Sequence, residues 1–109
     1  MKRLWLSTLL LVSCAAHPGG TSSVSSIFDD YLQQKARLDP NWATSVGIHD
    51  YDDRLTLQDD ASYEARCDLV SRTLVRLTAL DSESMDPEER IDYQLLRSEL
   101  EVEAYDFQR

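Results

Sequence analysis

Apolar residues recur every three or four positions along most of the chain, which is the spacing of an amphipathic helix. A first helix is predicted to start at Ser26, a residue type that caps helices well, and to stop before Asp39-Pro40. Its recurring positions are Phe28, Tyr31, Leu32, Lys35 and Ala36. No segment alternates strictly between apolar and polar residues, so no strand is predicted.

A short second helix is predicted directly after the first. Asp39 can cap it, Pro40 suits its first position, and Gly47 can end it in a left-handed turn. Its buried face is expected at Trp42, Ala43 and Val46. From Ile48 to Gln58 the sequence shows neither the three-to-four-residue spacing of a helix nor the alternation of a strand, and Asp is frequent. We therefore expect an ordered, Asp-rich loop.

Two longer helices are predicted in the second half of the chain. The first extends from Asp59 or Asp60 to Leu80, and its buried stripe is predicted at Ala65, Leu69 or Val70, Thr73 or Leu74, Leu77 and Leu80. The second starts with Asp86 as cap and Pro87 at the first position, and its apolar positions are Ile91, Leu95, Leu96, Leu100, Val102 and Phe107. The sequence therefore predicts an all-α fold of antiparallel helices.

The last predicted helix has no stop signal. No Gly, Asn or Pro follows Phe107, and the amphipathic pattern continues to Arg109. We therefore expect residues 26–109 to be the N-terminal helical region of a larger domain, truncated at its C-terminal end. The alternative is a natural end in a frayed helix.

The first residues are typical of an export signal. Met1-Lys2-Arg3 is positively charged, and the apolar stretch that follows, 4–12, is too short to span a bilayer. Leu11-Val12-Ser13-Cys14 resembles the lipobox of bacterial lipoproteins, which predicts a signal peptide at 1–13, cleavage before Cys14 and lipid on the Cys14 thiol. An ordinary secretory signal is the alternative. Residues 14–25 are small and polar and are predicted to be a flexible tether.

This signal also predicts where the protein resides. Two or three acyl chains on Cys14 would give a permanent membrane anchor, so the lipid bilayer is an expected partner. Ala15 follows Cys14, whereas an Asp at that position resembles an inner-membrane retention signal. An exported protein anchored in the cell envelope is predicted, in the outer membrane and facing the periplasm if the source is Gram-negative.

Charge and cysteine content narrow the possible partners. The net charge is −9, and both Lys2 and Arg3 precede Cys14, so the mature part is more acidic still. Such a surface repels nucleic acid, and no nucleic-acid partner is expected. If Cys14 is acylated, Cys67 has no partner within this chain, so no disulfide is expected.

The segment from Gly47 to Leu55 contains the residues most suited to chemistry, among them His49, Asp50 and Arg54. A calcium loop starting at Asp50 is excluded, because Leu55 and Ala61 stand where a Gly and a Glu are needed. A zinc site needs three or four ligands, whereas His49 is the single His of the region predicted to fold. No metal site is predicted in this chain.

A proton-transferring pair of His49 with Asp50 or Asp52 stays open, but a structural role is the preferred interpretation. Carboxylates beside an arginine commonly form ion pairs and turn caps. We therefore expect Arg54, set among Asp50, Asp52 and Asp53, to brace the loop. No catalytic residue is nominated, since the hydroxyls and Cys67 have no base near them in the sequence.

Three stretches taken together resemble a known family. They are Phe28-Asp29-Asp30-Tyr31, the run from Asp39 to Leu55 that contains Gly47-Ile48-His49-Asp50-Tyr51-Asp52-Asp53-Arg54-Leu55, and Ile91-Asp92-Tyr93-Gln94-Leu95-Leu96. Their order and spacing resemble the N-terminal part of the bacterial family called domain of unknown function 885. The resemblance covers residues 26–109, and His49, Asp50, Asp53 and Arg54 match the family's N-terminal motif.

The resemblance implies a parent protein that is long, mostly helical and exported, with an HExxH-type zinc-peptidase motif in its C-terminal half. In such an enzyme zinc polarises a water molecule and a glutamate acts as base. None of those residues occurs in this chain, so zinc and a peptide substrate are expected only for the full-length protein. Within it, the remainder of the parent chain would be the partner of these helices.

Two functions follow as expectations. The first is the N-terminal part of a membrane-tethered hydrolase of the cell envelope that resembles zinc peptidases. The second is a small acidic helical lipoprotein that acts as a non-catalytic binding module.

Overall fold

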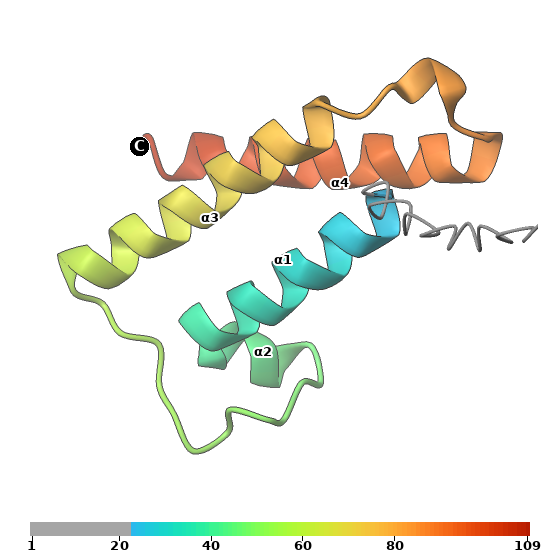
Figure 1. The fold of residues 1–109 in the computed structure, drawn as a ribbon. Helices are drawn as coiled ribbons and strands as arrows, with labels where there is room; N and C mark the ends of the chain where they lie inside the picture. The colour runs from blue at the N-terminus through green and yellow to red at the C-terminus, as the bar shows by residue number, and fades with distance from the viewer. Residues whose placement is uncertain (1–22) are drawn as a thin grey trace, which may run out of the picture.

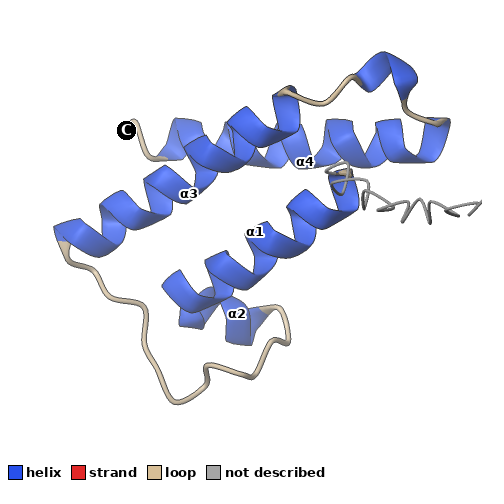
Figure 2. Ribbon diagram, viewed as in Figure 1, coloured by secondary structure: helices blue, strands red, loops and turns tan. Residues whose placement is uncertain are grey.

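The computed structural model describes residues 23–109, and the predicted signal peptide, the lipobox and Cys14 lie outside this range. The described part consists of four α-helices and one short 3-10 helix, with no strand among these residues, which confirms the all-α prediction (Figures 1 and 2). The elements are α1 (Val24–Leu38), α2 (Pro40–Ser45), α3 (Asp60–Thr78), η1 (Ser82–Ser84) and α4 (Pro87–Asp106).

Helix α1 begins earlier than the sequence suggested. Ser23 is its N-cap: the Ser26 backbone N–H donates to Ser23 Oγ at 3.1 Å, and the Ser23 N–H donates to Ser26 Oγ at 3.2 Å. Ser26 is therefore the second member of a capping box and not the cap itself. Val24 and Ser25, predicted as the end of the tether, belong to the helix, and Val24 is buried.

Helix α2 forms at the predicted place. Asp39 accepts a hydrogen bond from the Trp42 backbone N–H at 3.1 Å, Pro40 occupies the first turn, and Gly47 has a φ of 86°. The predicted buried face is only partly correct, because Val46 is exposed while Pro40 and Ala43 are buried. The helix ends at Ser45, so Val46 no longer follows the helical period.

Helices α3 and α4 form an antiparallel hairpin joined by η1. Their N-caps are Asp59 and Asp86, which accept backbone hydrogen bonds at 2.7 and 2.9 Å. The cap at Asp86 was predicted, whereas the sequence left the start of α3 open between Asp59 and Asp60. The start of α3 meets the end of α4, where the rings of Tyr63 and Phe107 pack edge to face and the Tyr63 hydroxyl donates to the Phe107 carbonyl at 2.6 Å.

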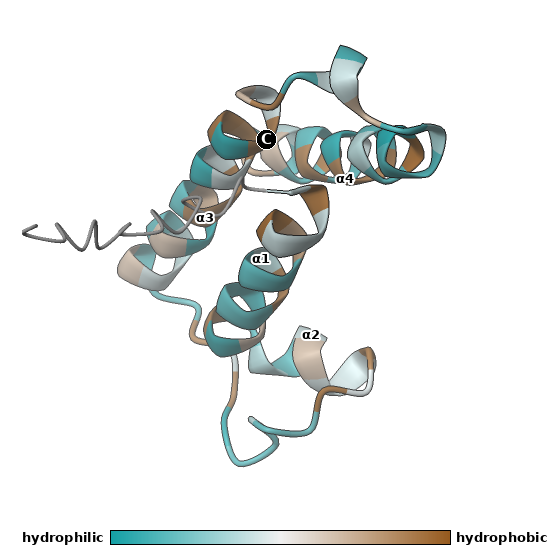
Figure 3. Ribbon diagram, turned by 45° about the vertical axis from the view of Figure 1, so that its right-hand side comes forward, coloured by the Kyte–Doolittle hydropathy of each residue, from teal (hydrophilic) through white to brown (hydrophobic). Residues whose placement is uncertain are grey.

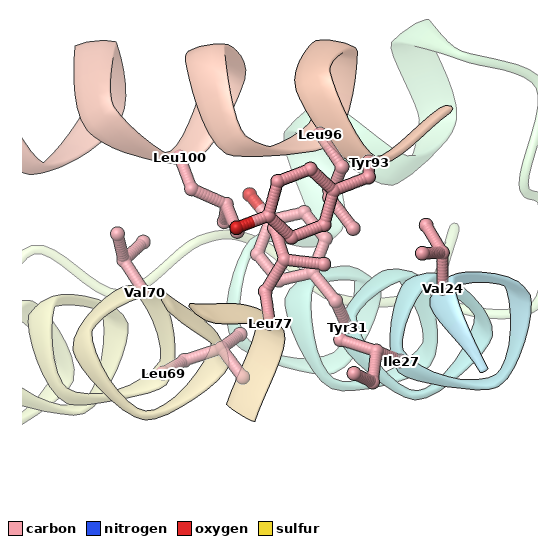
Figure 4. Close-up of a cluster of buried hydrophobic side chains, with 9 residues drawn as sticks. All are labelled: Val24, Ile27, Tyr31, Leu69, Val70, Leu77, Tyr93, Leu96 and Leu100. Carbon is pink, nitrogen blue, oxygen red and sulfur yellow. The ribbon is translucent and has the colours of Figure 1, made fainter. Parts of the chain in front are cut away.

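The core lies where α1 and α3, side by side and antiparallel, meet α4, which crosses over both (Figures 1 and 3). Apolar side chains from the three helices fill it (Figure 4): Val24, Ile27, Tyr31, Leu69, Val70, Leu77, Tyr93, Leu96 and Leu100. An ion pair of Arg76 with Asp30, at 3.0 Å, joins α3 to α1 at the surface.

Some of the apolar residues predicted on α4 are exposed and not buried. Tyr93, Leu96 and Leu100 are buried, but Ile91, Leu95 and Val102 are 56%, 62% and 61% exposed. The sequence pattern contains two apolar stripes on different faces of the same helix, and only one of them packs against α1 and α3.

Candidate functional site

The candidate site is a groove of about 500 Å³ between α1 and α4. Its α1 wall includes the partly exposed ring of Phe28 and the side chain of Leu32, and its α4 wall includes Leu95. The full lining is Val24, Ser25, Phe28, Tyr31, Leu32, Lys35, Trp42, Asp92, Leu95, Leu96, Glu99 and Glu103. It is thus an apolar groove with carboxylates on its α4 side.

Three polar side chains form the floor at one end of the groove. Lys35 Nζ lies 2.9 Å from both carboxylate oxygens of Glu103, and it donates to the Tyr31 hydroxyl at 3.1 Å. The Tyr31 hydroxyl in turn donates to Glu103 Oε2. Because the side chains of Lys35 and Glu103 are only 18% and 26% exposed, this is a largely desolvated ion pair.

Helix α2 brings an aromatic ring to the same place. The Asp39 cap fixes the first turn of α2 and so positions Trp42, whose ring centre lies 4.7 Å from Lys35 Nζ. The face of the ring attracts the ammonium group electrostatically in this cation–π contact. Lys35 is therefore positioned by Glu103, Tyr31 and Trp42 together.

Burial and the neighbouring Glu103 carboxylate raise the pKa of the Tyr31 hydroxyl well above its usual range. Burial is the larger cause, and the hydrogen bond to Glu103 is the second. Tyr31 is thus held neutral as a hydrogen-bond donor. Because the Tyr31 hydroxyl donates its proton to the hydrogen bond with Glu103, the cluster is suited to fixing the shape of the groove and not to transferring protons.

The predicted loop lies apart from this groove, since none of residues 47–55 lines it. The loop does bring His49 and Asp52 together: His49 Nδ1 lies 2.8 Å from Asp52 Oδ2, and the Thr44 hydroxyl donates to Asp52 Oδ1 at 2.6 Å. These two hydrogen bonds, the one from Thr44 first, lower the pKa of the exposed Asp52 carboxyl.

The order of groups in this cluster argues for a structural role. The carboxylate stands between the imidazole and the hydroxyl, so His49 is not placed to take a proton from Thr44. All three residues are exposed. The cluster joins the loop to α2.

The expected brace through Arg54 is wrong in its geometry. Among the described carboxylates Arg54 Nε pairs with that of Asp53 alone, at 4.0 Å, and the Arg54 side chain is 64% exposed. Its guanidinium carbon also lies 5.9 Å from the centre of the Tyr51 ring. Asp50 is exposed as well. The loop is instead fastened at its far end, where the Thr56 hydroxyl donates to the Asp39 carboxylate and accepts from the Asn41 backbone N–H at 3.1 Å.

Residues 23–109 lack two further features. They contain no group of three or more His, Cys, Asp and Glu side chains that could hold a metal ion. They also contain no helix with the length and apolar character needed to cross a bilayer. Cys67 is a free, half-buried thiol on α3 near Tyr63.

Comparison with models of protein families, with curated proteins and with solved structures finds no match to this chain.

Sequence reasoning missed the cluster on the floor of the groove, although a signal was present. Tyr31 and Lys35 are one helical turn apart on α1, and Glu103 falls on the buried stripe of α4, in register with Leu96 and Leu100. A charged residue on an apolar stripe needs a partner inside the fold. Its partner could not be identified without knowing which face of α1 meets α4.

Proposed function

We propose that residues 26–109 are the N-terminal helical region of an exported, membrane-tethered protein of the cell envelope that resembles zinc-peptidase-like hydrolases. In this proposal the helices bind a peptide or protein segment and supply no reacting group. The observation that carries the binding role is the open groove between α1 and α4, with apolar walls and a hydrogen-bonded polar floor.

The chemistry of the groove supports binding over catalysis. The buried side-chain nitrogen and oxygen atoms of the described residues all have hydrogen-bond partners, and the polar groups at the floor are engaged with one another. Ligand grooves commonly combine such apolar walls with a few fixed polar groups. The described residues do not offer a zinc site, so no catalytic step is assigned to them.

The test uses the full-length protein purified from its native envelope. Zinc-dependent hydrolysis of peptides is expected, and Phe28→Ala is expected to raise KM with little change in kcat, because the groove would bind substrate away from the reacting bond. Val75→Ala, a change at an exposed apolar residue of α3, is the matched control and should alter neither constant.

A second function, the small acidic helical lipoprotein that binds a partner without chemistry, is favoured by the carboxylates Asp92 and Glu99 beside the groove. It predicts a reading frame that stops at Arg109 and no hydrolysis by the native protein. A longer frame with a downstream HExxH motif and a further acidic ligand would contradict it. Activity unaffected by a zinc chelator would contradict the first proposal.

A further inference from the structure

The outer face of α4 forms an exposed apolar stripe along the whole helix. Ile91, Leu95, Val102 and Tyr105 are each more than half exposed, and Ser98 completes the spacing between them. Successive members are alternately four and three residues apart, which is the spacing of a coiled-coil seam. The buried stripe lies on the opposite face, so α4 is apolar on two sides.

The flanks of this outer stripe are acidic. Asp92, Glu99 and Asp106 occupy one flank, and the other holds Glu101 between two glutamines. Glu101 pairs with Arg97 on α4 at 2.7 Å, and Asp106 pairs with Arg109, just after α4, at 3.1 Å. Among the described residues, Asp92 and Glu99 take part in no ion pair.

This charge pattern opposes pairing with a second copy of the chain. In an antiparallel pair of α4 helices, the flank of Asp92, Glu99 and Asp106 would face its own copy. In a parallel pair, Glu101 would face Asp106 of the other copy. Both arrangements place carboxylate against carboxylate, which costs free energy.

The outer stripe continues into the groove between α1 and α4. Leu95 of the stripe and Asp92 and Glu99 of its flank all line the groove, so an apolar segment lying on the stripe would also meet the α1 wall at Phe28. The two free carboxylates therefore lie between the outer stripe of α4 and the α1 wall of the groove.

We propose that the outer face of α4 docks an amphipathic helix whose apolar stripe is flanked by lysine or arginine residues. The apolar side chains of such a helix would cover Leu95 and Val102, and its cations would pair with Asp92 and Glu99. This proposal does not depend on whether the parent protein is a hydrolase.

The experiment uses the full lipidated chain in uncharged detergent micelles and two labelled synthetic helices of three heptads. Both carry leucine at the core positions; one has lysine at all flanking positions and the other has glutamate there. Fluorescence anisotropy is expected to detect binding of the lysine helix alone, and raising the salt concentration should weaken that binding.

Two pairs of variants test the surface. Leu95→Ser and Glu99→Lys should each lower the affinity for the lysine helix by about tenfold, because one removes apolar contact and the other reverses a flanking charge. Val75→Ser and Glu64→Lys make the same chemical changes at exposed positions of α3 and should leave the affinity unchanged. All four positions are exposed, and circular dichroism would verify that each variant folds.

Several results would overturn the proposal. They are no binding of the lysine helix, equal binding of the glutamate helix, and wild-type affinity in Leu95→Ser or Glu99→Lys. A dimer in light scattering that Leu95→Ser converts to a monomer would show that a second copy covers this face instead.

Discussion

The Glu103 carboxylate accepts hydrogen bonds from two residues of α1, the Lys35 ammonium and the Tyr31 hydroxyl. It therefore connects α1 to α4 across the floor of the groove. Glu101, two residues earlier, makes a different kind of pair: its bond to Arg97 lies within α4, and both side chains are about half exposed. The two glutamates allow a direct comparison of a desolvated and a solvated ion pair on one helix.

Glu103→Ala is expected to lower the free energy of unfolding by about 2 kcal/mol, since it leaves a largely buried ammonium and a buried hydroxyl without their acceptor. Glu101→Ala should cost less than about 1 kcal/mol. Urea unfolding of the two variants measures both values. Equal losses would mean that the cluster does not hold α1 to α4.

The raised pKa of Tyr31 predicts a loss of stability at alkaline pH. Below the ordinary tyrosine pKa of 10.0 the hydroxyl is protonated in both states, and its hydrogen bond contributes in full. Above that value the unfolded chain ionises while the folded chain does not, so the free energy of unfolding falls as pH rises. Tyr31→Phe should be less stable at neutral pH but should show a flatter decline above pH 10, measured by urea unfolding.

The control for this pH series is Tyr105→Phe, a change at an exposed ring on α4. It is expected to keep the wild-type slope. A Tyr31→Phe slope as steep as that of the wild type would show that other groups cause the decline.

At the level of elements, the sequence was most informative about helix ends. Asp39 and Asp86 cap α2 and α4 as predicted, and Asp59, one of the two expected starts, caps α3. A cap depends on residues three positions apart and needs no tertiary information. The start of α1 was placed three residues late, since two serines in a capping box are both plausible caps from sequence alone. The fastening of the loop could not be predicted, because Thr56 and Asp39 are brought together only by the path of the chain.

Asp39→Ala is expected to lower the free energy of unfolding by about 1 to 2 kcal/mol, because Asp39 both caps α2 and accepts from Thr56. Arg54→Ala should change it by less than about 0.5 kcal/mol, given the exposed side chain and the 4.0 Å distance to Asp53. Thermal unfolding of both variants tests this order. A larger effect of Arg54→Ala would restore the arginine brace that the sequence suggested.

At the level of the whole molecule, the all-α class was predictable because helical periodicity extends over most of residues 26–109, outside the 48–58 loop. Which apolar positions would be buried was not. The six apolar positions predicted on α4 divide between two faces, and burial of only one face depends on how α1 and α3 approach it. The candidate groove was missed for the same reason, since its walls come from helices far apart in sequence.

The membrane anchor remains a prediction from the lipobox at Leu11-Val12-Ser13-Cys14. Cys14→Ser should move the protein from the membrane fraction to the soluble fraction, because no other thiol is presented in that sequence context. Cell fractionation with intact-mass analysis measures the effect, and Cys67→Ser is the matched control that should stay in the membrane. A soluble, unmodified wild-type chain would contradict the prediction.

The position of Trp42 provides a built-in optical probe. The chain has two tryptophans, and cleavage before Cys14 would remove Trp5 and leave Trp42 as the single indole. Because its ring lines the groove and contacts the Lys35 ammonium, its emission should respond when a bound segment displaces water from that end. Occupancy of the groove could then be followed in the unlabelled protein by intrinsic fluorescence, with a shift to shorter wavelength on binding.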